Sequence, residues 1–252
     1  MPSTTPAQQS ADPAVTQLNL PHHAEHACAE SSVARGEGIL QDVFATARLG
    51  KDVPLAEALA LVGEIDAMFQ RGNHMLLDVV RMKAEDEYTY IHSIAVCALM
   101  IRFARFLGMT EEEVRECGLA GLLHDVGKMR LPADVLHKHG PFTHDEYAEI
   151  KSHSEQGYQI LKGVAGIPPG AVEFARLHHE KIDGSGYPLG LSGEQIPLMA
   201  RMGAICDVYD ALTSERAYKV AWSPAAAIAK MVGSPGHFDP DLLGAFADSL
   251  KL

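Results

Sequence analysis

The stretch HHEKIDGSGYP, residues 178–188, is the most informative part of this 252-residue chain. Two adjacent histidines and a carboxylate lead into a loop that turns on Gly184 and Gly186 and is stiffened by Pro188. This order places metal ligands beside a mobile aromatic residue, Tyr187, which suits a molecule held over a metal centre. Further candidate ligands elsewhere in the chain are His92, His124, Asp125, His153 and Asp207. Imidazoles and carboxylates in this combination favour divalent metals such as iron, manganese, nickel and zinc.

The candidate ligands lie on separate segments with helical patterns. Spaced apolar residues or helix-start residues predict helices over 39–44, 55–68, 76–82, 87–107, 110–125, 143–153, 171–179, 198–219 and from 223 onward. Two of these helices begin with a capping-box pattern, formed by Thr110 with Glu113 and by Thr143 with Glu146. The sequence has no convincing alternating strand pattern and no internal repeat.

Two of the ligand pairs, His124-Asp125 and His178-His179, consist of neighbours in the sequence. Neighbours on a helix project about 100° apart, so they serve two adjacent metals better than one. A carboxylate between such residues can bridge the two ions. We therefore predict an all-α fold, a multi-helix bundle with a dinuclear metal site in its core, where such sites are commonly built.

Charge and cysteine usage restrict the class of protein. The formal net charge of −12 argues against binding to nucleic acid polymers or to an anionic membrane, since both require a basic face. The four cysteines are widely spaced, and three lie in apolar helical patterns, which favours reduced thiols in a cytoplasmic protein. No signal-peptide pattern is present, and Arg102 and Arg105 interrupt the most apolar run. A cytoplasmic location is therefore expected.

Three regions are predicted along the chain. Residues 1–32 are rich in Ser, Thr, Pro, Ala and Gln and are predicted to be a disordered tail. Residues 33–85 are predicted to form an N-terminal helical segment, and residues 86–252 a catalytic domain.

Several motifs together resemble the HD-GYP subgroup of the HD-domain phosphohydrolases. They are GLLHDVGK at 121–128, the 178–188 stretch, YTYIHS at 88–93, DVYDALTS at 207–214 and HFDP at 237–240. The resemblance covers roughly residues 85–245. Members of this family are all-α enzymes that hydrolyse cyclic di-GMP to linear pGpG and often to GMP. The resemblance therefore implies a metal-dependent cyclic di-GMP phosphodiesterase.

The resemblance also implies a ligand set. One metal would be held by His92, His124, Asp125 and Asp207. The second would be held by His153, His178 and His179 together with Asp125, which is shared as the bridge. Iron or manganese is the implied metal. Some relatives bind a third metal through a glutamate four residues before the first histidine, but that position is Tyr88 here and the nearest glutamate is Glu87. Two metals are therefore expected.

The implied reaction is attack of a metal-bridging hydroxide on the phosphodiester. Asp125 and Lys128 are the expected catalytic residues. The expected substrate-binding residues are Lys128, Asp183, Gly186, Tyr187, Arg216 and Lys219. Without the resemblance, Asp183 could equally well shape a turn, Tyr187 could pack in the core, and the three cations could be ordinary surface residues.

Two other functions stay open at this point. One is an HD phosphohydrolase that acts on another cyclic dinucleotide or nucleotide, and the other is a non-catalytic cyclic di-GMP sensor or adaptor. The expected partners are cyclic di-GMP, signalling proteins of the diguanylate cyclase type and a second copy of the chain. No nucleic acid polymer and no membrane are expected as partners.

Overall fold

The computed structural model describes residues 13–49, 53–73, 75–82, 88–136, 138, 140–215 and 221–251. These residues form helices and no β-strand, which confirms the all-α prediction. The elements are α1 (Pro13–Arg48), α2 (Leu55–Gln70), α3 (Met75–Met82), α4 (Tyr88–Phe106), α5 (Glu111–Leu123), the 3-10 helix η1 (Val126–Arg130), α6 (Ala133–Leu136), α7 (His144–Leu161), α8 (Pro169–Leu177), the 3-10 helix η2 (Gly193–Gln195), α9 (Leu198–Thr213), α10 (Pro224–Val232) and α11 (Pro240–Ser249).

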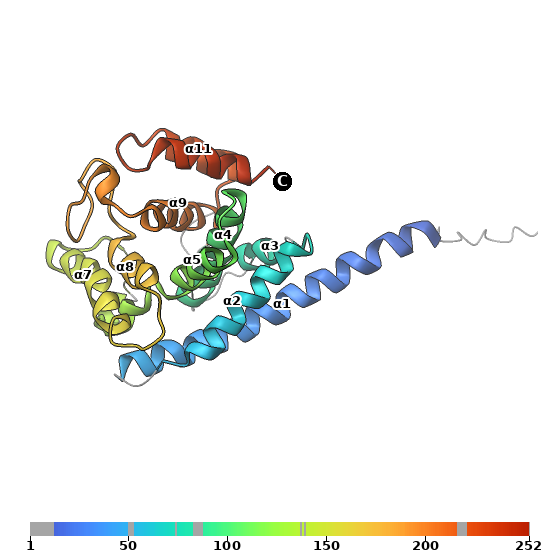
Figure 1. Cartoon of the computed structure of the whole chain (residues 1–252), viewed down its shortest axis with the longest axis horizontal. Helices are drawn as coiled ribbons and strands as arrows, with labels where there is room; N and C mark the ends of the chain where they lie inside the picture. Colours follow the sequence, from blue (N-terminus) through green and yellow to red (C-terminus); the bar gives the residue numbers. More distant parts are fainter. Residues whose placement is uncertain are drawn as a thin grey trace, which may run out of the picture.

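Helix α4 lies at the centre of the bundle, with α1, α2 and α5 on one side and α9 and α11 on the other (Figure 1). Every residue of the stretch 94–101 is buried. The window Thr89–Phe106 is long and apolar enough to cross a membrane, despite the interruption expected from Arg102 and Arg105, but 72% of it is buried inside the protein. The Arg102 side chain donates to Ser249 O, and that of Arg105 pairs with Asp66. Helix α4 is therefore buried as a core helix of the bundle.

Glycines allow the close approaches that bring the ligand-bearing elements together. A Cβ at Gly121 of α5 would lie 2.9 Å from Cys97 Cα of α4, so the two helices pack backbone against backbone. A Cβ at Gly127 of η1 would overlap His153 O of α7. The GLLHDVGK motif therefore needs both glycines. Gly121 lets α4 approach the backbone beside His124-Asp125, and Gly127 lets α7 do the same.

The predicted helix starts are confirmed at three positions. Thr110 and Thr143 each form a complete capping box with Glu113 and Glu146. Ser223 caps α10 by accepting a hydrogen bond from the backbone of Ala226. The helix predicted over 198–219 ends earlier, at Thr213, and residues 216–220 lie outside the described residues.

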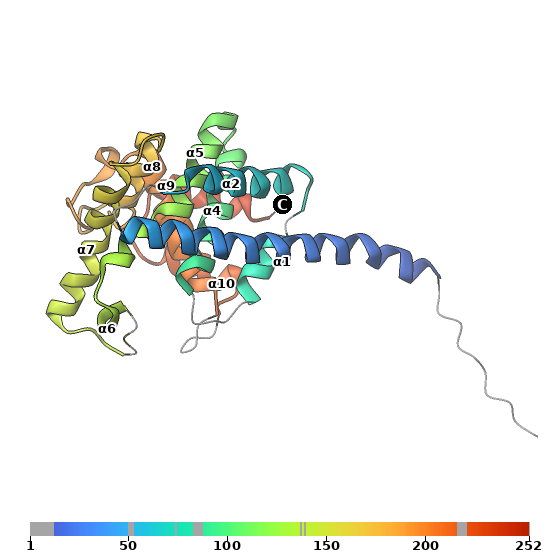
Figure 2. The same cartoon turned by 90° about the horizontal axis from the view of Figure 1, so that it is seen from below.

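The N-terminal prediction needs a correction, because residues 13–32 belong to the long helix α1 and are not a disordered tail. The first part of α1 extends beyond the body of the protein, while its later part lies along the bundle (Figures 1 and 2). Ala29 and Ser32 are buried at the point where α1 reaches the bundle. The buried residues Ala29 and Ser32 are small, so they gave no apolar pattern in the sequence. Once this part of α1 is packed, the helix can extend toward Pro13, because helix formation is cooperative. Residues 1–12 lie outside the described residues.

Candidate metal centre

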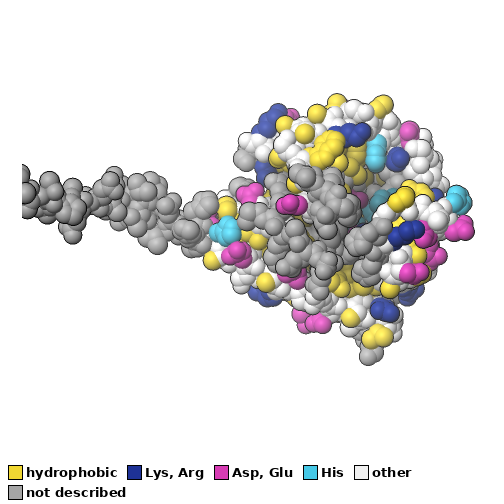
Figure 3. Space-filling view, turned by 180° about the vertical axis from the view of Figure 1, so that it is seen from behind, with side chains coloured by type: hydrophobic (Ala, Val, Ile, Leu, Met, Phe, Trp, Pro, Cys, Tyr) yellow, Lys and Arg dark blue, Asp and Glu magenta, His cyan; other side chains and the backbone are white. Residues whose placement is uncertain are grey.

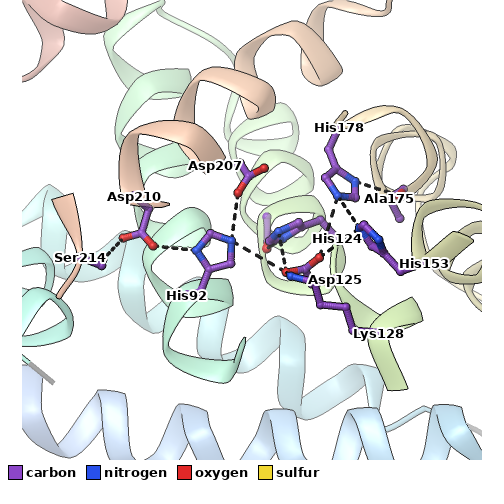
Figure 4. Close-up of polar contacts among 11 residues, drawn as sticks. His92, His124, Asp125, Lys128, His153, Ala175, His178, Asp207, Asp210 and Ser214 are labelled. Carbon is purple, nitrogen blue, oxygen red and sulfur yellow. Dashed lines mark hydrogen bonds and ion pairs between the residues drawn. The ribbon is translucent and has the colours of Figure 1, made fainter. Parts of the chain in front are cut away.

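The seven predicted ligands come together in the core of the bundle. His92 lies on α4, His124 and Asp125 lie between α5 and η1, His153 lies on α7, His178 and His179 follow α8, and Asp207 lies on α9. All are buried except His179, which is partly exposed. Figure 4 shows the imidazoles of four of them turned toward the Asp125 carboxylate.

Each of four imidazoles is fixed through its Nδ1 atom by a group outside the centre. The partners and distances are Asp210 Oδ2 for His92 (2.7 Å), Gly121 O for His124 (2.7 Å), Ile150 O for His153 (2.5 Å) and Ala175 O for His178 (3.0 Å). A carbonyl or carboxylate oxygen only accepts, so Nδ1 carries the proton and donates it. The Nε2 atoms of His124, His153 and His178 are left as lone pairs that point inward, which is the usual orientation of metal-bound histidine, whereas His92 Nε2 lies 3.0 Å from Asp207 Oδ1.

The inward-facing atoms fit a cation better than they fit one another. Among the described residues, nothing hydrogen-bonds to His124 Nε2, although this atom is buried. His153 Nε2 lies 3.1 Å from His178 Nε2, so two lone pairs face each other. Two nitrogen ligands, each about 2.1 Å from one ion and at right angles, would lie about 3 Å apart. The residues present therefore fit a divalent metal ion.

The Asp125 carboxylate lies between two groups of ligand atoms. Its Oδ2 atom is 3.4 Å from His124 Nε2 and 3.9 Å from His92 Nε2. Its Oδ1 atom is 3.5 Å from His153 Nε2 and 3.9 Å from His178 Nε2. Two sets of ligand atoms could each hold an ion, namely His92 with His124 and Asp125, and His153 with His178 and His179. One oxygen thus faces each set.

The two sets differ in their electrostatics. Burial alone would lower the pKa of His92, but hydrogen bonds to Asp207 and Asp210 raise it to about 9. Burial lowers the pKa of His153 and His178, and lowers that of His179 to about 3. Burial would raise the pKa of the Asp125 carboxyl, but Lys128 and His124 hold it well below its usual range. The centre therefore holds ionised carboxylates, a protonated His92 and neutral imidazoles.

The loop after His179 is held in place by Glu180, the buried carboxylate that follows the two histidines and for which the sequence predicted no role. Its carboxylate accepts hydrogen bonds from the backbone N–H groups of Leu189, Gly190 and Leu191, at 2.7, 3.1 and 3.1 Å. A Cβ at Gly186 would overlap the backbone of residues 179–181, so only glycine fits there. The loop is thus folded back onto the metal centre.

Two residues of this loop were predicted to bind substrate. The Asp183 side chain is exposed and accepts a hydrogen bond from Ser185 N at 2.9 Å, which is the turn-shaping geometry. Tyr187 lies against His179, with ring centroids 4.7 Å apart and an interplanar angle of 31°, and it is partly exposed. Tyr187 therefore lies beside the candidate metal ligand His179 instead of filling the apolar core.

The predicted cations and the third-metal position are only partly described. Lys128 Nζ lies 2.5 Å from Asp125 Oδ2, at the edge of the centre. Arg216 and Lys219 lie outside the described residues, as does Glu87, and the side chain of Tyr88 is not described. Figure 3 shows histidine side chains in and beside a hollow on one face, with Lys and Arg side chains near its rim.

Asp210 is a second residue that the sequence analysis missed as part of the site. It is buried, it holds His92 Nδ1, and its Oδ1 atom accepts a hydrogen bond from Ser214 Oγ at 2.8 Å. A signal was available, because residues three apart on one helix share a face, so Asp210 had to follow Asp207 toward α4.

Comparison with known proteins places this arrangement in a family. Residues 68–242 match the HD domain family. The chain is 44% identical over 247 residues to the cyclic di-GMP phosphodiesterase PA4108 of Pseudomonas aeruginosa, and this match covers 98% of the chain and 59% of that relative. It is 38% identical over 164 residues to the 3'3'-cGAMP-specific phosphodiesterase 2 of Vibrio cholerae, covering 64% of the chain and 31% of that relative.

A solved structure shares the fold. The HDG"Y"P protein Bd1817 of Bdellovibrio bacteriovorus superimposes with a TM-score of 0.72 at 21% identity, covering 89% of this chain and 72% of that one. The family match spans more than half of the chain and includes all seven candidate ligands. The chain therefore belongs to the HD-domain family, as the resemblance to its HD-GYP subgroup implied.

Proposed function

We propose that this chain is a phosphodiesterase that hydrolyses cyclic di-GMP to linear pGpG with two divalent ions, iron or manganese. The observation that carries the proposal is the position of Asp125, whose two carboxylate oxygens face two separate sets of buried ligands. The 44% identity to a cyclic di-GMP phosphodiesterase over 98% of the chain supports the choice of substrate. The chain spans 59% of the length of that relative.

Each ion has a proposed set of ligands. His92, His124 and Asp207 would hold one ion and His153, His178 and His179 the other, with Asp125 shared between them. Bound divalent ions would supply activation of water and neutralisation of the charge that develops on the phosphate. His124, His153 and His178 are held in the correct tautomer before any ion binds, because their Nδ1 protons are already donated.

The remaining residues would bind and orient the substrate. Lys128 would exchange part of its pairing with Asp125 for a phosphate oxygen. Tyr187 and Gly186 would form the wall of the substrate pocket, and Asp183 would shape the loop that carries them. Arg216 and Lys219 would add cations for the phosphate.

The deciding experiment measures turnover directly. The purified chain is stripped with a chelator, reloaded anaerobically with Fe(II), Mn(II) or Zn(II), and mixed with cyclic di-GMP. Products are resolved by chromatography over time, so that pGpG and any later GMP appear separately. We expect pGpG to form with iron or manganese. Tight binding of cyclic di-GMP without turnover under every metal would contradict the enzyme and support a sensor or adaptor.

A second candidate substrate is 3'3'-cGAMP, because a relative specific for it is 38% identical to this chain. The same assay with 3'3'-cGAMP gives a ratio of kcat/KM values for the two cyclic dinucleotides. We expect this ratio to favour cyclic di-GMP, and a ratio in the opposite direction would reassign the substrate while leaving the metal chemistry unchanged.

The cellular setting is also part of the proposal. We propose a cytoplasmic location, supported by three buried free thiols, Cys97, Cys117 and Cys206, whose burial raises their pKa values and keeps them protonated. Cell fractionation checks this. A homodimer and an association with diguanylate cyclase-type proteins are proposed as well. Light scattering on the purified chain tests the first, and titration with a purified cyclase tests the second.

A further inference from the structure

A lysine of α7 lies beside the loop 180–191 that carries Tyr187, here called the substrate loop, and has no part in the function described so far. Lys151 Nζ lies 5.6 Å from the centroid of the Tyr187 ring and 5.0 Å from that of the Tyr147 ring. The Tyr187 ring in turn lies against His179. A single aromatic ring therefore separates the Lys151 ammonium from a candidate metal ligand. Tyr147 is 51% exposed, and Lys151 and Tyr187 are partly exposed, so this group lies at the surface.

The neighbouring cations have carboxylate partners, but Lys151 has none among the described residues. Lys138 pairs with Glu146, and Arg176 pairs with Glu155. Lys128 pairs with Asp125. Two tyrosine rings hold the Lys151 ammonium by cation–π contacts, which position a cation without neutralising it. An unneutralised cation beside the substrate loop is notable in a chain with a net charge of −12.

The chemistry of a cyclic dinucleotide calls for such a group. Its ring contains two phosphodiesters, and only one of them can lie at Asp125 during a single hydrolysis step. The other phosphodiester carries a negative charge that the candidate metal centre does not neutralise. A lysine ammonium is a compact point charge that binds a phosphate oxygen well from a flexible stem.

We propose that Lys151 binds the second, non-reacting phosphodiester of the cyclic dinucleotide, and that Tyr147 and Tyr187 hold its ammonium in place. This proposal rests on the proposed function, because it takes a cyclic dinucleotide as the substrate. It makes Lys151 a residue for substrate positioning and for selection of a substrate with two phosphates. Lys151 does not touch the reacting phosphate.

The test compares two lysines of similar chemistry near the same helix. Lys151→Met removes the proposed contact. Lys162→Met is the matched control, because Lys162 caps the C-terminal end of α7 and its ammonium lies 5.3 Å from the Tyr158 ring. Both variants change the net charge equally. Lys151→Met should raise KM for cyclic di-GMP on the order of 10-fold, the effect of losing one charge-assisted hydrogen bond, and should keep kcat within about 2-fold. Lys162→Met should leave both constants unchanged, and Lys151→Arg should restore most of the affinity.

A second ligand distinguishes binding of the non-reacting phosphodiester from binding of the reacting one. Linear GpG has one phosphodiester, and its Kd for the metal-loaded protein is measured by calorimetry alongside that of cyclic di-GMP. Lys151→Met should weaken the binding of cyclic di-GMP and leave the Kd of GpG unchanged. An equal loss of affinity for both ligands, or a loss no larger than that caused by Lys162→Met, overturns the proposal. These affinities need no turnover, so they remain decisive even if the wild-type chain fails to hydrolyse cyclic di-GMP and the proposed function falls.

Discussion

The two sides of the candidate metal centre are built from different chemistry. The carboxylate side consists of His92, His124 and Asp207, and the histidine side consists of His153, His178 and His179. On the carboxylate side Asp207 and Asp210 raise the pKa of His92 to about 9, whereas burial lowers the pKa of His179 to about 3 on the histidine side. Asp125 lies between the two sides.

The two sides would accept an ion in different ways. The metal-free histidine side already has neutral imidazoles, so it would bind a cation without releasing a proton. The metal-free carboxylate side holds a proton on His92, which would have to leave as the ion binds. The histidine side also contacts the substrate loop through His179 and Tyr187, whereas the carboxylate side is enclosed by α4 and α9. The sides would therefore differ in metal affinity, in pH dependence and in their effect on substrate binding.

The largest effect is expected from Asp125→Ala, because Asp125 is the one candidate ligand that faces both sides. Turnover of cyclic di-GMP should fall by a factor on the order of 1,000 or more, and both ions should be lost or weakened together. Metal analysis of the dialysed protein and a kcat measurement check this. Asp134→Ala, at an exposed position of α6, is the control. Retention of two ions with normal activity would refute the bridging role.

Changes confined to one side should remove one ion only. Asp207→Ala and His179→Ala should each reduce kcat on the order of 100-fold or more and leave about one ion per chain, because each removes a ligand from one side. Only His179→Ala should also raise KM, since it removes the ring that supports Tyr187. Metal-to-protein ratios and full rate curves separate the two variants. Loss of both ions in either variant would mean that the sides do not bind metal independently.

The outer support of His92 differs from that of His124, His153 and His178, which backbone carbonyls hold. Asp210 supports His92 with a side chain, whereas His153 and His178 are supported by backbone carbonyls. Asp210→Asn should therefore weaken metal binding on the carboxylate side about 10–100-fold, the usual effect of losing such a partner. Titration of the metal-free protein with Mn(II) measures this, with Asp248→Asn as an exposed control. A weakened histidine-side ion with an unchanged carboxylate-side ion would contradict the assignment.

The sequence predicted the parts of the molecule that depend on local chemistry. Capping boxes at Thr110 and Thr143 depend on residues three apart, so they were found directly. The seven candidate ligands were identified from motifs, and the structure brings them together. The roles of Glu180 and Asp210 were missed because their partners lie in other segments: the loop backbone of 189–191 and His92 on α4. The helix at 13–32 was missed because burial against the bundle, which no local pattern encodes, stabilises its later part.

The pH dependence of stability in the metal-free protein should reflect the two sides in opposite directions. The pKa of His179 is lowered when folded, so the unfolded chain takes up protons first and stability falls as the pH drops below about 6.5. The pKa of His92 is raised to about 9, so its contribution is complete below about 6.5 and is lost as the pH rises toward 9. Calorimetry at pH 5, 6.5 and 9 should give the highest Tm at 6.5, by a few degrees. A Tm that rises steadily from pH 5 to 9 would contradict the protonated His92.

The smallest effect compares the same substitution on the two sides. Ser214 Oγ donates to Asp210 Oδ1, so Ser214→Ala should lower metal affinity on the carboxylate side about 5-fold, as expected for one hydrogen bond two contacts away from the ion. Ser154, next to His153, is buried and its hydroxyl has no hydrogen-bond partner among the described residues, so Ser154→Ala should change neither affinity nor kcat. Because the expected losses decrease from Asp125 to Asp207, Asp210 and Ser214, they follow the order of contact with the ion. An equal loss in both serine variants, measured by Mn(II) titration, would mean that packing around the centre, and not the chain of hydrogen bonds through Asp210, sets metal affinity on the carboxylate side.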